Sequence, residues 1–593
     1  MTRVLNSRSV LPVLALWMVV LCALVSLHFV LIQFRLTGMN HTLTYSPVVV
    51  QHADAVFTHI PIVRKLLSGL PAFGDQFVNN MDTHQITAWP RLPYYFLALI
   101  GWPIANRLDA LPIVATVLLT PLNAAIMYQL VRRITGSVAV GVLGTSAALT
   151  LRELFVLQPW HWTNIEGLER LFVSPFFSNA LVHPQISFAF CCVVLLCLYK
   201  LVRNTDSTTY VINGILYGVS FYTYFYLWTF LTVVYGVIAL YLLQRRDYIT
   251  LVSLAKAAGL ALIISSFYWI DVMRFSGQPG FADFQDRFSL GRHPDLTERV
   301  VNLRPHLITI LGLVLAMTRR SISYIYLFVL TVTAELMWKI PIVIGRDYQS
   351  LHYAYHFYGP LAGITLIVGV RDLLLRFSFA INRSVRIFCY ALVGLCISTM
   401  TIYRAVKYSN EHYKNFVIHT DVQDAYEFVR NNVSPGSVLL AADPEVNMRI
   451  RSIAPVYVYV PSGYGTFVTT EEMLLRHSEM LRFFDITADQ MLEYQWQDVI
   501  SRRLYDAGLL DPGKYIFNGS LRYPTNDLRN QAIIQSYSAL NIESLTYDAD
   551  IVWVGPFENI IGGTSMKERE DLVLVYENES VQLYQFHTVK PLY

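Results

Sequence analysis

A short segment near residue 350 gathers side chains that are suited to binding a phosphate group. It reads Gly-Arg-Asp-Tyr-Gln-Ser-Leu-His-Tyr-Ala-Tyr-His and contains Arg346, His352, Tyr353, Tyr355 and His356. An arginine binds phosphate oxygens through parallel N–H groups, and tyrosine and histidine add further donors. We therefore predict a phosphate-binding site here. The alternative is a solvated loop in which the arginine forms only a weak surface ion pair with the aspartate beside it.

An acidic residue, Asp54, stands at the start of an amphipathic pattern near the N-terminus. The apolar residues Val56, Ile60, Val63 and Leu67 recur at helical spacing and share one face. We expect this helix to lie on the membrane surface. A carboxylate at its start could act as a general base on an acceptor hydroxyl or contact a metal ion. The alternative is an ordinary helix N-cap that favours the helix dipole.

Two further polar groups lie in predicted external loops. Asp82 and His84 precede the segment Trp-Pro-Arg-Leu-Pro-Tyr-Tyr, and Glu166, Glu169 and His183 lie in or beside a tryptophan-rich loop. We consider both groups candidates for substrate contacts. The alternatives are plain polar loops and aromatic residues of the membrane interface. The sequence contains no P-loop, no Gly-x-Gly-x-x-Gly, no His-Glu-x-x-His and no serine nucleophile elbow.

Apolar runs long enough to cross a membrane must position these residues, since a transmembrane helix needs about 20 apolar residues. Basic pairs between the runs mark their cytoplasmic ends, which places the N-terminus in the cytoplasm and the C-terminal part outside. Residues 93–105 are predicted to be re-entrant or to lie on the surface. We predict eleven spans, at about 11–34, 111–131, 137–157, 182–201, 210–226, 229–244, 249–270, 306–317, 322–338, 357–375 and 386–405.

Composition divides the chain of 593 residues into two parts. Hydrophobic residues make up 54% and charged residues 15%, which excludes a disordered chain and a nucleic-acid-binding protein. Residues 406–593 carry 25 acidic and 15 basic residues, net −10, and the remainder carries 30 basic and 17 acidic, net +13. All six cysteines lie in apolar runs, so the polar part has no disulfide framework.

The predicted fold is therefore a polytopic α-helical membrane protein with a C-terminal extracytoplasmic α/β domain. The membrane domain spans 1–405 and includes an external loop at 35–92, and the soluble domain spans 406–593. In the soluble domain, β-branched and aromatic runs predict strands at 437–441, 455–460 and 550–555. The runs at 572–576 and 580–586 predict a hairpin.

In organisation, the chain resembles the GT-C superfamily of integral-membrane glycosyltransferases. A first span leads into a long external loop that opens with an acidic residue, here Ala-Asp54-Ala-Val-Phe-Thr-His-Ile. The loop ends in Trp89-Pro-Arg-Leu-Pro-Tyr-Tyr95, which is similar to the family's His-Pro-Pro-Leu-Tyr-Tyr type. A span that ends in Val131-Arg-Arg-Ile-Thr-Gly136 follows. The late aromatic and histidine segment and the α/β tail also fit this organisation.

The resemblance implies transfer of a sugar, with inversion, from a polyprenyl-phosphate donor to a glycan, lipid or protein acceptor at the outer membrane face. Asp54 would be the general base or a metal contact, and Glu166 or Glu169 would take the family's second acidic position. The donor phosphate would lie near Arg346 and the segment from His352 to His356. Dependence on a divalent cation, Mg or Mn, is left open, because Asp54 stands between two alanines instead of in a tandem acidic pair or an Asp-x-Asp, and the second loop has no clear Asp-x-Asp. The tail lacks the Trp-Trp-Asp-Tyr-Gly motif of oligosaccharyltransferases.

Three other functions remain open from the sequence. A membrane transporter or flippase would need ionisable residues within its spans and often an inverted repeat. The others are an envelope polymer ligase of a different fold and a non-catalytic assembly or sensor protein whose tail binds glycans. Equal sugar transfer by Asp54→Ala and the wild type would show that the assignment of Asp54 is wrong, and a wild type that consumes no polyprenyl-phosphate donor but moves a solute across vesicles would exclude the enzyme.

Overall fold

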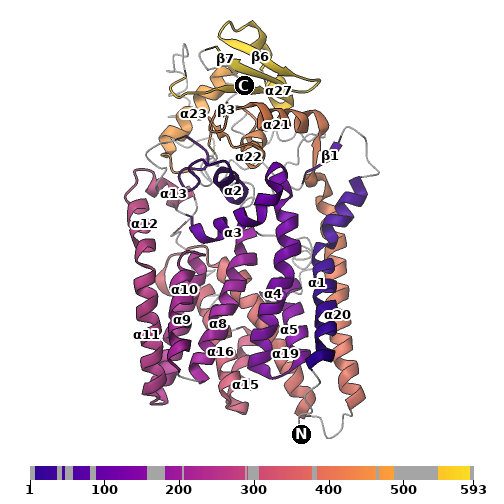
Figure 1. Cartoon of the computed structure of the whole chain (residues 1–593), viewed down its shortest axis with the longest axis vertical. Helices are drawn as coiled ribbons and strands as arrows, with labels where there is room; N and C mark the ends of the chain where they lie inside the picture. Colours follow the sequence, from indigo (N-terminus) through magenta and orange to yellow (C-terminus); the bar gives the residue numbers. More distant parts are fainter. Residues whose placement is uncertain are drawn as a thin grey trace.

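The computed structural model describes residues 7–36, 43–46, 58–79, 89–156, 181–203, 206–287, 290, 306–376, 383–461, 466–485, 545–561 and 563–587. Within these ranges a helical body carries an α/β domain at one end (Figure 1). This confirms the predicted fold class, a polytopic helical membrane protein with a C-terminal α/β domain.

Long helices that run roughly parallel form the membrane domain (Figure 1). Their side chains share a large core of leucine, valine and aromatic residues. The helices are α1 (Ser7–Leu36), α4 (Leu111–Thr135), α5 (Val138–Thr150), α8 (Ser187–Arg203), α9 (Ser207–Ser220), α10 (Phe225–Gln244), α11 (Tyr248–Ile264), α12 (Ser266–Ser276), α15 (Leu307–Arg319), α16 (Ile322–Trp338), α19 (Gly359–Arg376) and α20 (Arg383–His412).

Five helices in the described ranges are long and apolar enough to cross a membrane, or six if α11 and α12, bent by 49°, form one span. Shorter apolar helices, Val138–Thr150, Leu307–Arg319 and Ile322–Trp338, lie where three further spans are predicted. The total of eleven spans stays a prediction. Residues 93–105 form α3 (Arg91–Gly101) and the start of a 3-10 turn (Trp102–Ala110), which leads into α4. Helix α3 exposes Tyr95, Leu99 and other apolar side chains.

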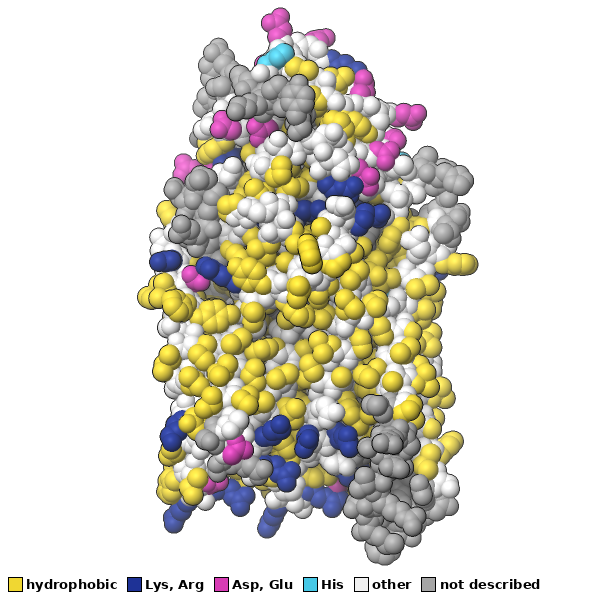
Figure 2. All heavy atoms as spheres, in the orientation of Figure 1, with side chains coloured by type: hydrophobic (Ala, Val, Ile, Leu, Met, Phe, Trp, Pro, Cys, Tyr) yellow, Lys and Arg dark blue, Asp and Glu magenta, His cyan; other side chains and the backbone are white. Residues whose placement is uncertain are grey.

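The surface divides into bands along the long axis. On the face in Figure 2, hydrophobic side chains form a broad belt over the helical body. Lysine and arginine gather at the end of this body away from the α/β domain, and most acidic side chains lie on that domain. Helix α1 begins at the basic end and the chain ends in the α/β domain (Figure 1). These bands are the pattern expected when basic residues fix membrane orientation.

The α/β domain is built on a five-stranded sheet of order β4-β3-β5-β7-β6. Strand β3 (Val438–Leu440) is parallel to β4 (Tyr457–Val458) and to β5 (Ile551–Val554), and β7 (Gln582–Phe586) is antiparallel to β5 and β6 (Leu572–Glu577). The predicted strands and the predicted hairpin are thus confirmed. Helices α21 (Thr420–Asn432), α22 (Pro444–Ile453), α23 (Thr470–Phe483) and α27 (Pro556–Ile561) complete the domain.

The described parts of the predicted external loop pack against the α/β domain. Strand β1 (Leu43–Tyr45) pairs antiparallel with β2 (Val417–His419). Helix α2 (Ile60–Leu67) packs against both α3 and α22, and its residues from Ile60 to Lys65 are buried. The prediction of a helix lying on the membrane surface is therefore wrong, because the α/β domain covers its polar face as well.

Candidate functional site

A buried ionic cluster lies at the ends of α5 and α20 that face the α/β domain. The short helix α6 (Arg152–Val156) follows α5 and supplies Arg152 and Glu153. The Glu153 carboxylate accepts one hydrogen bond from Arg152 Nε at 2.6 Å and another from Arg404 Nη1 at 2.7 Å. The Glu153 and Arg404 side chains are only 5% and 3% exposed. Two guanidinium groups around one carboxylate give this place a positive balance among the described residues.

Arg152 also reaches the aromatic and histidine segment that the sequence singles out. Its Nη1 donates to His356 Nδ1 at 3.1 Å and to the Tyr355 carbonyl oxygen at 3.3 Å. Because a guanidinium group can only donate, His356 accepts through Nδ1, and its own proton lies on Nε2. Residues Ala354–Tyr358 form a π-helical turn, a wider turn that is frequent at functional sites.

One turn earlier, His352 joins the same cluster through two tyrosines at the start of α10. Its Nδ1 lies 2.5 Å from the Tyr224 hydroxyl oxygen, and its ring stacks on Tyr226 with centroids 4.4 Å apart. The ring centroids of His352 and His356 are 5.3 Å apart. The Tyr226 hydroxyl donates to Gln349 Oε1 at 2.9 Å. The predicted pair of histidines therefore lies on one face, beside an arginine and two tyrosines.

Two other members of the predicted phosphate group, Tyr353 and Arg346, have further contacts or exposure of their own. The Tyr353 hydroxyl oxygen is 2.7 Å from Thr229 Oγ1 on α10, and the Tyr353 side chain is buried in the helical core. Arg346 is exposed, and the neighbouring Asp347 accepts a hydrogen bond from the Ser350 backbone N–H at 2.8 Å. A substrate role for Arg346 and for Tyr353 stays a prediction.

A second buried ion pair borders the same end of the bundle. The Glu335 carboxylate on α16 pairs with Lys339 one turn later and accepts the His306 backbone N–H at 2.8 Å. His306 Nε2 lies 3.3 Å from the Val156 carbonyl oxygen at the end of α6. This contact packs the start of α15 against α6, the helix that carries Arg152.

Several predicted site residues lie outside the described residues: Asp54, Asp82, His84, Glu166 and Glu169. His183 belongs to the π-helical turn Leu181–Ile186, which leads into α8, and its side chain is outside the described part as well. Their roles stay predictions. No three His, Cys, Asp or Glu side chains come together as a metal site within the described ranges. A divalent cation in contact with Asp54 stays a prediction from the resemblance.

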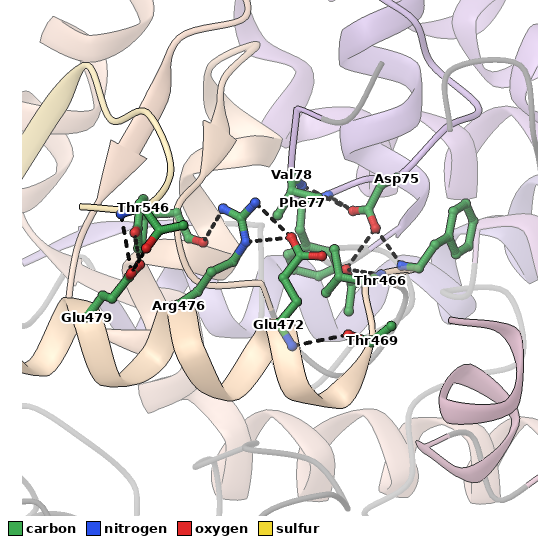
Figure 3. A network of polar contacts seen from close by, with 12 residues as sticks. Asp75, Phe77, Val78, Thr466, Thr469, Glu472, Arg476, Glu479 and Thr546 are labelled. Atoms are coloured by element: carbon green, nitrogen blue, oxygen red, sulfur yellow. Dashed lines mark hydrogen bonds and ion pairs between the residues drawn. The ribbon is translucent and has the colours of Figure 1, made fainter. Parts of the chain in front are cut away.

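The loop that follows Asp54 is fixed to the α/β domain by one carboxylate. Asp75, which is 2% exposed, accepts the Phe77 and Val78 backbone N–H groups through Oδ1 at 2.8 and 3.1 Å. Its Oδ2 accepts the Thr466 hydroxyl at 2.8 Å and the Phe467 N–H at 2.5 Å (Figure 3). A carboxylate with four donors is well satisfied, and it ties the first loop to the segment before α23.

Buried cations strengthen the same junction. Arg64 donates to the Ser452 carbonyl at 3.0 Å, Lys65 to the Asp75 carbonyl at 3.2 Å, and Arg451 to the Gln76 carbonyl at 3.1 Å. Burial lowers the pKa of Arg64 to about 10 and of Arg451 to about 9, and it lowers the pKa of Lys65 as well. Carbonyl oxygens thus solvate cations that the sequence alone would place on a surface.

Sequence reasoning missed Arg152, Glu153 and Arg404. All three lie inside or at the edge of the predicted transmembrane spans 137–157 and 386–405. A signal was available, because charged residues within apolar runs are costly and usually functional. The ion pair between Arg404 and Glu153 could not be predicted from the sequence, because the two residues are 251 positions apart.

No protein-family model matches this chain, and no curated protein matches it. Among solved structures 21 chains match, including two crystal structures of ArnT from Cupriavidus metallidurans. The structure bound to undecaprenyl phosphate is similar at a TM-score of 0.47 and 10% sequence identity, over 96% of this chain and 97% of that one. The apo structure is similar at a TM-score of 0.43 and 11% identity, over 92% and 94%.

Proposed function

We propose that this chain is a membrane glycosyltransferase that moves a sugar, with inversion, from a polyprenyl-phosphate donor to an acceptor. The reaction takes place at the membrane face that carries the α/β domain, which the sequence predicts to be extracytoplasmic. The observation that carries the proposal is the cluster of Arg152, His352, His356 and Tyr224 at the boundary between the apolar belt and this domain. A lipid-linked sugar with an apolar tail and an anionic head group needs cationic side chains and neutral hydrogen-bond donors at such a boundary.

The proposed reaction is a single displacement at the anomeric carbon of the donor. The acceptor oxygen forms a bond to that carbon while the bond to the phosphate oxygen breaks, and the electron pair stays on the phosphate. The acceptor proton passes to Asp54, the candidate general base. The products are the glycosylated acceptor and free polyprenyl phosphate.

The cluster would stabilise the charge that develops on the leaving phosphate. Arg152 is fixed by Glu153 and Arg404, so its guanidinium is already oriented when the donor binds. His356 presents a proton on Nε2, and His352 is held by the Tyr224 hydroxyl. Preorganised donors aimed at developing negative charge are commonly the largest contribution to this kind of catalysis.

The experiment measures binding of a sugar-free polyprenyl phosphate to the purified full-length chain. His356→Asn keeps an oxygen that accepts from Arg152 but removes the Nε2 proton, and it leaves the Glu153 ion pairs in place. Losing one hydrogen bond to a charged phosphate costs about 1.5–3 kcal/mol, which is a weakening of about 10-fold or more. His587→Asn is the matched control, because it makes the same change at an exposed position of the α/β domain.

Two results contradict the proposal at different points. Equal binding by His356→Asn and the control would show that the phosphate lies elsewhere. A wild-type chain that consumes no polyprenyl-phosphate sugar, but moves a solute across vesicles, would replace the enzyme with a transporter. Asp54→Ala tests the general base separately, since it should abolish transfer while leaving polyprenyl-phosphate binding unchanged.

A further inference from the structure

An open pocket lies at the end of the helical bundle opposite the α/β domain. Its volume is about 480 Å³, and its lining consists of Arg319, Ser321, Tyr324, Leu375 and Arg376. These residues come from the end of α15, the start of α16 and the end of α19. The three helices carry their labels near the lower end of the body in Figure 1. The volume is within the range typical of small-ligand sites.

The charge around this cavity is positive. Arg319 and Arg376 share one buried carboxylate, that of Asp372, which accepts from Arg376 Nε at 2.9 Å and also from Arg319. The two arginines are 37% and 49% exposed, whereas Asp372 is 3% exposed. The carboxylate therefore orients both guanidinium groups and leaves the three groups with a net charge of +1, and each arginine keeps exposed surface. The Ser321 and Tyr324 hydroxyls add neutral donors to the lining.

Apolar surface adjoins the cavity on the helices that form it. In the last turns of α15, Val314 and Met317 are 47% and 65% exposed. On α19, Leu373 and Leu375 are 55% and 37% exposed. A ligand whose anionic head lies between the arginines could thus extend acyl chains along this surface. A free phosphate ion would use only the polar part.

We propose that this cavity binds the head group of an anionic phospholipid in the leaflet opposite the α/β domain. The two arginines contact the phosphate, the hydroxyls of Ser321 and Tyr324 contact its remaining oxygens, and the acyl chains lie on α15 and α19. Basic pockets between membrane helices on the cytoplasmic side are a recurrent way to bind such lipids. This site is separate from the proposed donor site and independent of the proposed sugar transfer.

The test uses the full-length chain in mixed micelles with phosphatidylglycerol or phosphatidylcholine, and native mass spectrometry counts the retained lipid. Arg376→Gln leaves Asp372 paired with Arg319, so the fold is retained. Arg133→Gln is the matched control, with the same charge change at the exposed end of α4. We expect Arg376→Gln to lower phosphatidylglycerol retention about tenfold, the loss of one charge-assisted contact, and the control to leave it within twofold. Tyr324→Phe, which keeps every charge, should give an intermediate loss.

Three outcomes would overturn the inference. Equal losses in Arg376→Gln and Arg133→Gln would mean diffuse attraction by the basic rim. Equal retention of phosphatidylcholine and phosphatidylglycerol by the wild type would exclude selection by charge. Displacement of the lipid by millimolar inorganic phosphate, in wild type but not in Arg376→Gln, would assign the cavity to a free phosphate instead.

Discussion

Replacing Asp75 with asparagine should loosen the junction between the first loop and the α/β domain by about 1.5–3 kcal/mol. The amide places an NH₂ group where Oδ2 now accepts the Thr466 hydroxyl and the Phe467 N–H. The hydroxyl can turn and accept from the new amide, but the backbone N–H cannot, so one charge-assisted bond is lost. Flipping the amide would instead orphan the N–H groups of Phe77 and Val78, which is worse.

Hydrogen exchange of the full-length protein measures this change directly. The loss corresponds to an increase of about 10- to 150-fold in the exchange rate of the Phe467 amide. Glu568→Gln is the matched control, because it removes the same charge from an exposed position in the same domain. An increase below about twofold at Phe467 would refute the reasoning. An equal increase in the control variant would do the same.

Three further predictions concern the buried groups. Glu153→Gln leaves two guanidinium groups around an amide and should destabilise the protein by about 3–5 kcal/mol. The control Glu411→Gln, at a 47% exposed position, should cost less than 1 kcal/mol. Thermal unfolding compares the two variants, and equal unfolding midpoints would contradict the proposed ion pairs of Glu153. Burial lowers the pKa of His477 to about 4. Between this pH and about 6.5, the His477 side chain is therefore neutral in the folded state and protonated in the unfolded state. Stability should therefore fall with pH below about 6.5, by up to about 1.4 kcal/mol per pH unit down to pH 4, and a His477→Leu variant with an unchanged slope would refute this. Gly280→Ala would place a Cβ 1.9 Å from the Phe467 carbonyl oxygen, so we expect faster proteolysis at this contact, and unchanged cleavage would contradict it.

The elements that the sequence predicted well are those set by local pattern. The strand at Ile551–Val554 and the hairpin from Leu572 to Phe586 follow from β-branched and aromatic runs around polar turns. Helix α20 extends past residue 405 to His412, where Lys407 and Glu411 form an i,i+4 pair. A search for apolar runs could not predict this extension, because the last turns of the helix are polar.

Only part of the candidate site could be predicted from the sequence. His352 and His356 are four residues apart and so share a helix face, whereas Tyr353 is turned away from them. That much follows from spacing. The partner Arg152 does not, since it is 204 residues from His356, and only the packing of α6 against the π-helical turn brings them together. Helix α2 was misplaced for a related reason, because its cover lies in a domain encoded more than 370 residues later.

The junction around Asp75 also sets an order of events during synthesis. Asp75 and Phe467 are 392 residues apart, and ribosomes add about 5–20 residues per second. The first loop therefore waits about 20–80 s for the segment that buries it. During this interval Arg64 and Lys65 are without the carbonyls and aromatic ring that α22 and β4 later provide. The loop is thus among the first parts to be synthesised and among the last to fold, and a chain stopped before residue 466 would leave it exposed to proteases.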